Sequence, residues 1–157
     1  MTATVDVKPT ETAAGVAQLL GPAVVELTAL SVTGKQAHWH VKGSNFVPVH
    51  ELLDSIVDHA RDAADTAAER IVALGAPIDA TLAAVAKQTE TPAFPTGFIT
   101  ADTAIDEVVK HMDVVLSKLR DAVKPLGEID DMSQDVAIEI VRGLDKDRWF
   151  LDSSRTL

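Results

Sequence analysis

A row of acidic side chains along one long predicted helix constrains the fold of this chain more than any other feature. Residues 46–74 have a helical pattern and, at about 1.5 Å per residue, would span on the order of 40 Å, a length typical of helical bundles. Five carboxylates follow His50 at steps of four or three, namely Asp54, Asp58, Asp62, Asp65 and Glu69. Because three and four residues both approximate one turn, these side chains return to nearly the same helix face. Like charges so placed repel one another, so this face is expected to meet either water or a cation.

Two pairs in this row have the spacing of metal ligands. His50 and Asp54 stand four residues apart, which presents both side chains to one point, and Asp65 and Glu69 repeat the arrangement. The pairs are ~16 Å apart along the axis, whereas the ligands of one ion lie within ~2–2.5 Å of it. Either the pairs serve separate sites, or a dyad near residues 59–60 lays one pair beside the other pair of an antiparallel copy. A solvated acidic stripe without a metal is the third interpretation.

The residue types indicate which metals such a site would hold. An imidazole with three carboxylates suits Fe(II), Mn(II) or Zn(II), and the oxygen ligands favour the oxidised ion Fe(III). Two further histidines, His38 and His40, lie just ahead of the row. Because residues two apart point to different sides of a helix, at most one of them is expected to join the site.

The first part of the chain is also helical, with one interruption. From about Thr10, hydrophobic residues recur at threes and fours, but Pro22 falls inside this pattern. Proline removes an intrahelical hydrogen bond and favours the first turn of a helix. The main helix is therefore expected to start near Gly21, with residues 12–20 as a separate turn or a kinked extension.

Two more long helices are predicted after a long connection that contains a short helix. Pro125 and Gly127 are expected to close the third long helix, and Ser133 is expected to cap the fourth. The connection at residues 78–100 is long enough to travel the length of a bundle. Without strand signals, the pattern indicates an all-α bundle. The predicted helices span about residues 21–42, 46–74, 79–87, 101–123 and 133–151.

The composition fits one domain and excludes several classes of protein. The chain has 157 residues, 46% of them hydrophobic, so a single domain over residues 10–157 can bury a large core behind a flexible tail at residues 1–9. The absence of cysteine excludes disulfides and thiolate metal sites. No run approaches the ~18 apolar residues of a membrane span, and no secretory signal is visible, so we expect a cytoplasmic protein without a membrane partner.

Three segments of the sequence resemble the signature of the Dps proteins, the mini-ferritins of the ferritin-like superfamily. They are KQAHWHVKGSNF from Lys35, VHELLD from Val49 and DTAAER from Asp65. The resemblance covers most of the chain and weakens at both tails and through residues 76–100. It implies a ferritin-like four-helix bundle with a long crossover containing a short helix, assembling from two-fold dimers into a hollow homo-dodecamer.

The resemblance also implies a ferroxidase site shared between subunits. In that family one subunit supplies two histidines and an aspartate, which fall on His38, His50 and Asp54. Its partner supplies an aspartate and a glutamate, which fall on Asp65 and Glu69. The implied reaction oxidises Fe(II), by hydrogen peroxide in preference to O2, and the Fe(III) product is stored as mineral, which protects against oxidative stress.

Other residues match or depart from the family pattern. Trp39 matches a tryptophan beside the site, and is either a core aromatic or a group that intercepts radicals. His40 stands where the family often has asparagine, so it is either an extra ligand or an altered neighbour. We expect structural roles for His59, which lies near the proposed dyad, and for His111. Four acidic residues either line a cation pore at a three-fold axis or form a solvated loop: Glu128, Asp130, Asp131 and Asp135.

Charge argues against DNA binding. Dps members that bind DNA often use tails rich in lysine or arginine, but residues 1–15 carry one lysine against two acidic residues. Residues 152–157 carry one arginine against one aspartate, and the net charge of the chain is −10. Phosphate binding therefore lacks its main driving force, and we expect weak or absent DNA binding. The alternative functions are a nucleoid DNA-binding protein and a metal-dependent amide or ester hydrolase that uses the same site.

Overall fold

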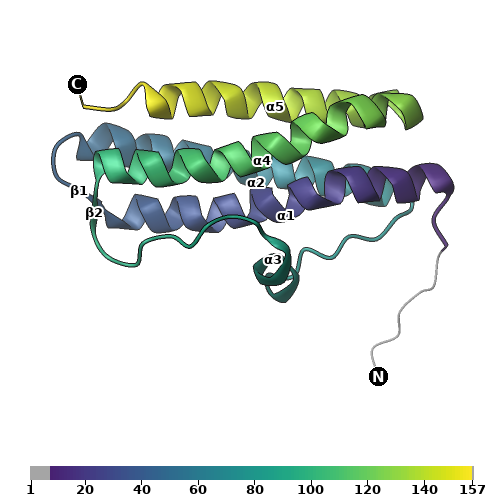
Figure 1. The fold of residues 1–157 in the computed structure, drawn as a ribbon, viewed down its shortest axis with the longest axis horizontal. Helices are drawn as coiled ribbons and strands as arrows, with labels where there is room; N and C mark the ends of the chain where they lie inside the picture. Colours follow the sequence, from purple (N-terminus) through teal and green to yellow (C-terminus); the bar gives the residue numbers. More distant parts are fainter. Residues whose placement is uncertain (1–7, 157) are drawn as a thin grey trace.

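Four long helices pack into a bundle, and a short helix lies on its outside (Figure 1). The computed structural model describes residues 8–156, so most of the predicted tail at residues 1–9 lies outside the described residues. The elements in chain order are α1 (Glu11–His40), β1 (Val41–Lys42), α2 (Phe46–Ala73), α3 (Leu82–Gln88), β2 (Ile99–Thr100), α4 (Ala101–Ile129) and α5 (Asp131–Asp152). The prediction of an all-α bundle with a helix-containing crossover is confirmed.

Helix α1 runs through Pro22 without interruption, so the predicted start near Gly21 is wrong. It begins instead at the Thr10 cap, whose hydroxyl accepts a hydrogen bond from the Ala13 amide at 3.2 Å. Pro22 is exposed, and so is Gln18, whose carbonyl loses its helical partner. Water can satisfy that carbonyl, which makes the proline tolerable at this position. Although α1 is long and apolar enough to cross a membrane, 61% of its most apolar window is buried, as in a core helix of a bundle.

The crossover from α2 to α4 is held against α1 by a buried carboxylate. Glu26 is only 2% exposed and accepts hydrogen bonds from the Thr89 hydroxyl, the Glu90 amide and the Thr91 hydroxyl, at 2.7, 2.7 and 2.9 Å. These bonds fix the path of the segment after α3. At its far end, β2 pairs in parallel with β1, so the expectation of no strand is wrong for these two short segments.

The junction of α4 and α5 differs from the prediction. Helix α4 continues through Pro125 to Ile129, because the carbonyl freed by that proline belongs to the exposed residue Asp121. Gly127 serves close packing, since a Cβ there would overlap the side chain of Gln134 on α5. Asp130, not Ser133, caps α5: its carboxylate accepts from the Ser133 amide at 2.9 Å.

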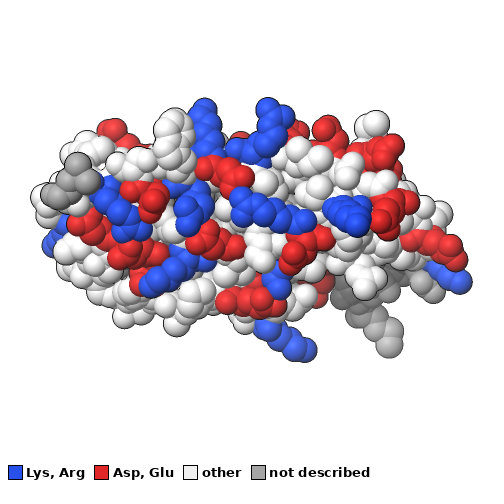
Figure 2. All heavy atoms as spheres, turned by 45° about the horizontal axis from the view of Figure 1, so that its top comes forward, with Lys and Arg blue, Asp and Glu red and all other residues white. Residues whose placement is uncertain are grey.

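Cross-helix ion pairs join α4 and α5. Figure 2 shows acidic and basic side chains interspersed over the face that these helices share. Arg148 donates to Asp113 at 2.6 Å, and Arg120 pairs with Asp145. Helices α2 and α5, by contrast, touch only sparsely, which leaves a pocket between them.

Candidate metal centre

His38 at the end of α1 and His50 at the start of α2 lock one another in place. The Nδ1–H of His38 donates to the backbone carbonyl of His50, and the Nδ1–H of His50 donates to the carbonyl of His38, both at 2.9 Å. The two rings stack with centroids 3.6 Å apart and an angle of 22° between their planes. Because a carbonyl only accepts, the Nδ1 of each ring carries a proton. Nε2 is therefore the ring nitrogen that each of these histidines has left to bind a ligand.

A carboxylate and an ammonium group complete this end of the site. Asp54 lies one turn after His50 on α2, and its Oδ1 is 3.9 Å from the Nδ1 of His38. Lys35 on α1 forms an ion pair with the same carboxylate. The hydrogen bond from Lys35 is the main cause that lowers the pKa of Asp54, so this ligand is ionised at neutral pH. The sequence contained Lys35 within the matching segment but gave no sign of this role.

The second acidic pair lies elsewhere on the same helix. Asp65 and Glu69 are exposed on α2, and neither makes an ion pair or side-chain hydrogen bond within residues 8–156. No group of three or more histidine, aspartate or glutamate side chains in this part of the chain is arranged to hold a metal ion. One chain therefore places Asp54 close to the stacked pair of His38 and His50 without forming a three-ligand metal site, and it leaves the other two predicted ligands apart.

The surface around this half-site has features of a subunit interface. Asp65 borders a shallow groove between α1 and α2, whose wall on α1 includes Thr28. Val32 and Trp39 continue the same stripe of α1 at helical spacing and are 57% and 63% exposed. Leu82 on the adjoining α3 is 82% exposed. Apolar side chains so placed indicate a surface that another protein covers.

The other predicted residues fall in distinct environments. The exposure of Trp39 shows that it is not a core aromatic of this chain. His40 donates through Nδ1 to the Gln36 carbonyl at 2.8 Å, and its ring lies 5.7 Å from that of Phe98. His111 is fully buried and bonded to the Thr33 hydroxyl at 2.8 Å, as expected for a structural residue; burial lowers its pKa and keeps it neutral.

The four acidic residues proposed for a pore are not equivalent. Asp130 accepts from the Ser133 hydroxyl and from Arg70, and these two bonds hold its pKa below the ordinary value of 3.8. The carboxylate of Asp130 is thus already bonded to groups of its own chain. Glu128 at the end of α4, and Asp131 and Asp135 at the start of α5, are exposed.

Comparison with known proteins identifies the class of this fold. The family model described as the ferritin-like domain matches residues 18–155, so the chain is a ferritin-like protein. The DNA protection during starvation protein of Agrobacterium fabrum is 32% identical over 146 residues, covering 92% of this chain and 90% of that protein. The protein of the same name from Mycolicibacterium smegmatis is also 32% identical, covering 88% and 76%.

Solved structures narrow the class. The structure of Dps from Microbacterium arborescens in the high iron form superposes with a TM-score of 0.89 at 54% identity, covering 96% of this chain and 97% of that chain. The Dps92 structure from Deinococcus radiodurans superposes with a TM-score of 0.87 at 26% identity. The chain therefore belongs to the Dps family. Iron storage and protection against oxidative damage are the general functions of this family.

Proposed function

We propose that this protein oxidises Fe(II) at sites shared between two copies of the chain and stores the Fe(III) product inside a hollow dodecamer. The reciprocal bonds between His38 and His50 are the observation that carries this proposal. Both Nδ1 atoms donate to backbone carbonyls, so the Nε2 atoms are the ring nitrogens left for a metal, and the ionised carboxylate of Asp54 lies 3.9 Å from the Nδ1 of His38. Imidazole with carboxylate is a ligand set that suits Fe(II).

A two-fold partner supplies what one chain lacks. Asp65 and Glu69 are exposed and have no ion pair or side-chain hydrogen bond within residues 8–156, and this acidic pair begins ~16 Å along α2 from Asp54. An antiparallel copy of α2 brings its own acidic pair to the histidines of the first chain, and the reverse holds at the second site. The exposed Val32, Trp39 and Leu82 are covered by the same contact.

In the proposed reaction, Fe(II) replaces the ammonium group of Lys35 at Asp54. Lys35 neutralises Asp54 in the protein alone, and Fe(II) displaces that ammonium group from the carboxylate. Two Fe(II) ions at one site reduce one molecule of hydrogen peroxide; with two water molecules they form two units of FeO(OH) and release four protons. Because both electrons pass together, no hydroxyl radical is set free. Hydrogen peroxide is the preferred oxidant, with O2 as the slower alternative.

Neighbouring residues support this reaction. Trp39 follows His38 directly and is exposed towards the proposed interface, where it is placed to intercept a radical that escapes the paired step. Glu128, Asp131 and Asp135 offer carboxylates for a cation pore at a three-fold axis, with Asp130 fixing the turn that presents them. The protein acts in the cytoplasm, and its net charge of −10 per chain opposes DNA binding.

Anaerobic Fe(II) titration followed by peroxide tests the proposal. The assembled wild-type protein and a His50→Ala, Asp54→Ala double variant are compared by the rate at which Fe(II) disappears. The wild type is expected to oxidise Fe(II) much faster than the variant, whose rate falls to that of Fe(II) with peroxide alone. Equal rates in the two proteins would remove the assignment of these residues as the oxidation site.

A further inference from the structure

The turn between the two histidine-bearing helices is bonded to the C-terminal end of the chain. Asn45, the last residue before α2, has φ 62° and ψ 18°, and among residues 8–156 it is the only residue besides glycine with a positive φ. Asparagine adopts this conformation more readily than most residues do. The Asn45 side chain does not cap α2. Its Nδ2 instead donates to the backbone carbonyl of Ser154 at 2.6 Å, and Figure 1 shows the turn and the C-terminus at the same end of the bundle.

The segment that accepts this bond is itself anchored. Residues 153–156, which we call the C-terminal clasp, follow the end of α5 and bond to the first turns of α4. The Thr156 amide donates to the Asp102 carboxylate at 3.0 Å, and Arg155 forms an ion pair with Asp106. Because these two contacts fix the clasp on α4, the bond from the turn ties the start of α2 to two other helices.

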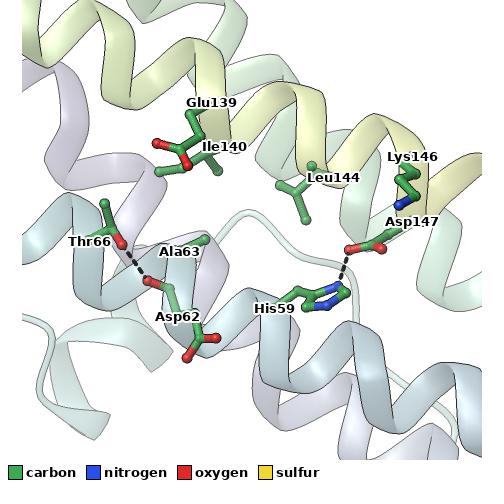
Figure 3. A pocket seen from close by; sticks show the side chains of 10 residues that line it. His59, Asp62, Ala63, Thr66, Glu139, Ile140, Leu144, Lys146 and Asp147 are labelled. Atoms are coloured by element: carbon green, nitrogen blue, oxygen red, sulfur yellow. Dashed lines mark hydrogen bonds and ion pairs between the residues drawn. The ribbon is translucent and has the colours of Figure 1, made fainter.

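His50 depends on the position of this turn, because its ring is held through the backbone. The Nδ1 of His50 donates to the His38 carbonyl at 2.9 Å, and within residues 8–156 the ring has no hydrogen bond to a side chain. His59, further along α2, is held differently, since its Nδ1 donates to the Asp147 carboxylate on α5 at 2.8 Å (Figure 3). The placement of the His50 ring therefore follows the placement of the first turn of α2 relative to the end of α1.

The hydrogen bonds of α2 hold this first turn only weakly. The first backbone bond of the helix, from the Val49 amide to the Asn45 carbonyl, is 3.4 Å long, beyond the ~2.7–3.2 Å usual for such bonds. The helix also begins without a side-chain cap, so the amides of its first turn lack that partner. The bond from Asn45 to the clasp supplies a hold that the hydrogen bonds of the helix do not.

We propose that Asn45 and the C-terminal clasp are positioning elements of the oxidation site, which hold the first turn of α2 so that His50 stays stacked on His38 with its remaining ring nitrogen available to Fe(II). This inference rests on the proposed function for the identity of the metal, whereas the bonds that carry it lie within one chain. A neutral hydrogen bond favours one position of the turn by about twofold to tenfold, which sets the size of the effect expected on metal affinity.

Two measurements on Asn45→Gly in the assembled protein test this role. Glycine accepts a positive φ without strain but has no side-chain amide, so the variant removes the bond to the clasp and keeps the turn. Amide hydrogen exchange of residues 49–53, whose bonds close the first turns of α2, is expected to become faster. The affinity for Zn(II), which resembles Fe(II) in ligand preference and is not oxidised, is expected to fall by about twofold to tenfold. Only the Zn(II) binding that is lost in the His50→Ala, Asp54→Ala double variant is counted.

His59→Gln is the matched control. It removes a bond between α2 and α5 that lies nine residues beyond His50, so exchange of residues 49–53 and Zn(II) affinity should both stay as in the wild type. Arg155→Ala loosens the clasp from α4 without altering α2. It should change both quantities in the same direction as Asn45→Gly, and it keeps the test valid if glycine itself disturbs the turn.

Three results would overturn the proposal. Wild-type exchange rates in Asn45→Gly would show that the clasp does not hold the turn. Faster exchange with unchanged Zn(II) affinity would show that the hold does not position His50, and an equal loss of affinity in His59→Gln would show a general loosening of the bundle. Failure of the ferroxidase proposal is a separate outcome, because the wild type would then oxidise no Fe(II), whereas neither exchange nor Zn(II) affinity depends on oxidation.

Discussion

The exposed leucine of α3 offers a direct test of the proposed contact between two copies of the chain. Leu82 is 82% exposed, and Leu82→Asp replaces its apolar contact with a charge. Burying one leucine side chain contributes about 1.5–3 kcal/mol, and a dyad buries two copies, which gives about 3–6 kcal/mol per dimer. The dimer constant of the variant is therefore expected to fall by about two to four orders of magnitude. Removing the leucine alone accounts for this loss, before any cost of desolvating the new carboxylate.

Sedimentation velocity and Fe(II) oxidation are measured together on the same samples. Leu82→Asp is expected to sediment as smaller species at micromolar concentration and to lose oxidation in proportion to the loss of dimers. Leu82→Met, which keeps a similar apolar area, should assemble and oxidise Fe(II) like the wild type. A Leu82→Asp variant that is monomeric yet oxidises Fe(II) at the wild-type rate would refute the shared site. A fully assembled variant would refute the placement of α3 in the interface.

Three further outcomes are expected. Glu26→Ala leaves three donors of the crossover without their acceptor and should lower the free energy of unfolding by about 3 kcal/mol, with Glu26→Gln losing less; equal thermal midpoints would contradict the anchoring role. The lowered pKa of Asp130 means that its stabilisation is present above the ordinary carboxyl pKa of 3.8 and is lost as the pH falls below it. The thermal midpoints of wild type and Asp130→Asn should accordingly differ most near neutral pH and converge in acid, and a constant gap would contradict this. In a gel shift at low salt and neutral pH, the assembled protein should leave supercoiled DNA unretarded, whereas retention at modest protein excess would show that charge does not exclude binding.

Most helix boundaries could be predicted because the hydrophobic period is strong. The start of α1 and the end of α4 were predicted wrongly, because each was placed at a proline that lies inside the helix. Pro22 and Pro125 both lie inside helices, because each frees a carbonyl on an exposed turn where water replaces the lost bond. Exposure of a single carbonyl depends on how helices pack, which local sequence does not encode. The cap of α5 also depends on packing between helices. Asp130 caps α5 in place of the predicted Ser133, and Arg70 on α2 holds the Asp130 carboxylate in position.

Some features of the candidate site could be predicted from the sequence, whereas others depend on contacts between helices. Spacing on one helix predicted that His50 and Asp54 point to one place, but it left open whether the other acidic pair serves a separate site, a second chain or only water. The assignment to a second chain came from the resemblance to the Dps family. The bonds between His38 and the His50 carbonyl, and between Lys35 and Asp54, join two helices and have no sequence signal. His59 was expected to have a structural role, and its ring bonds to Asp147 on α5, a partner 88 residues away that could not be predicted from the sequence.

Mixing two inactive variants tests the central claim most directly. One variant carries His50→Ala and Asp54→Ala, the other carries Asp65→Asn and Glu69→Gln, and each alone is expected to oxidise no Fe(II) above the rate without protein. After joint dissociation and reassembly, about half of the dimers are mixed, and each mixed dimer has one intact site of two. The mixture is therefore expected to recover about one quarter of the wild-type rate. No recovery from two properly assembled variants, or full activity in either variant alone, would contradict a site built by two chains.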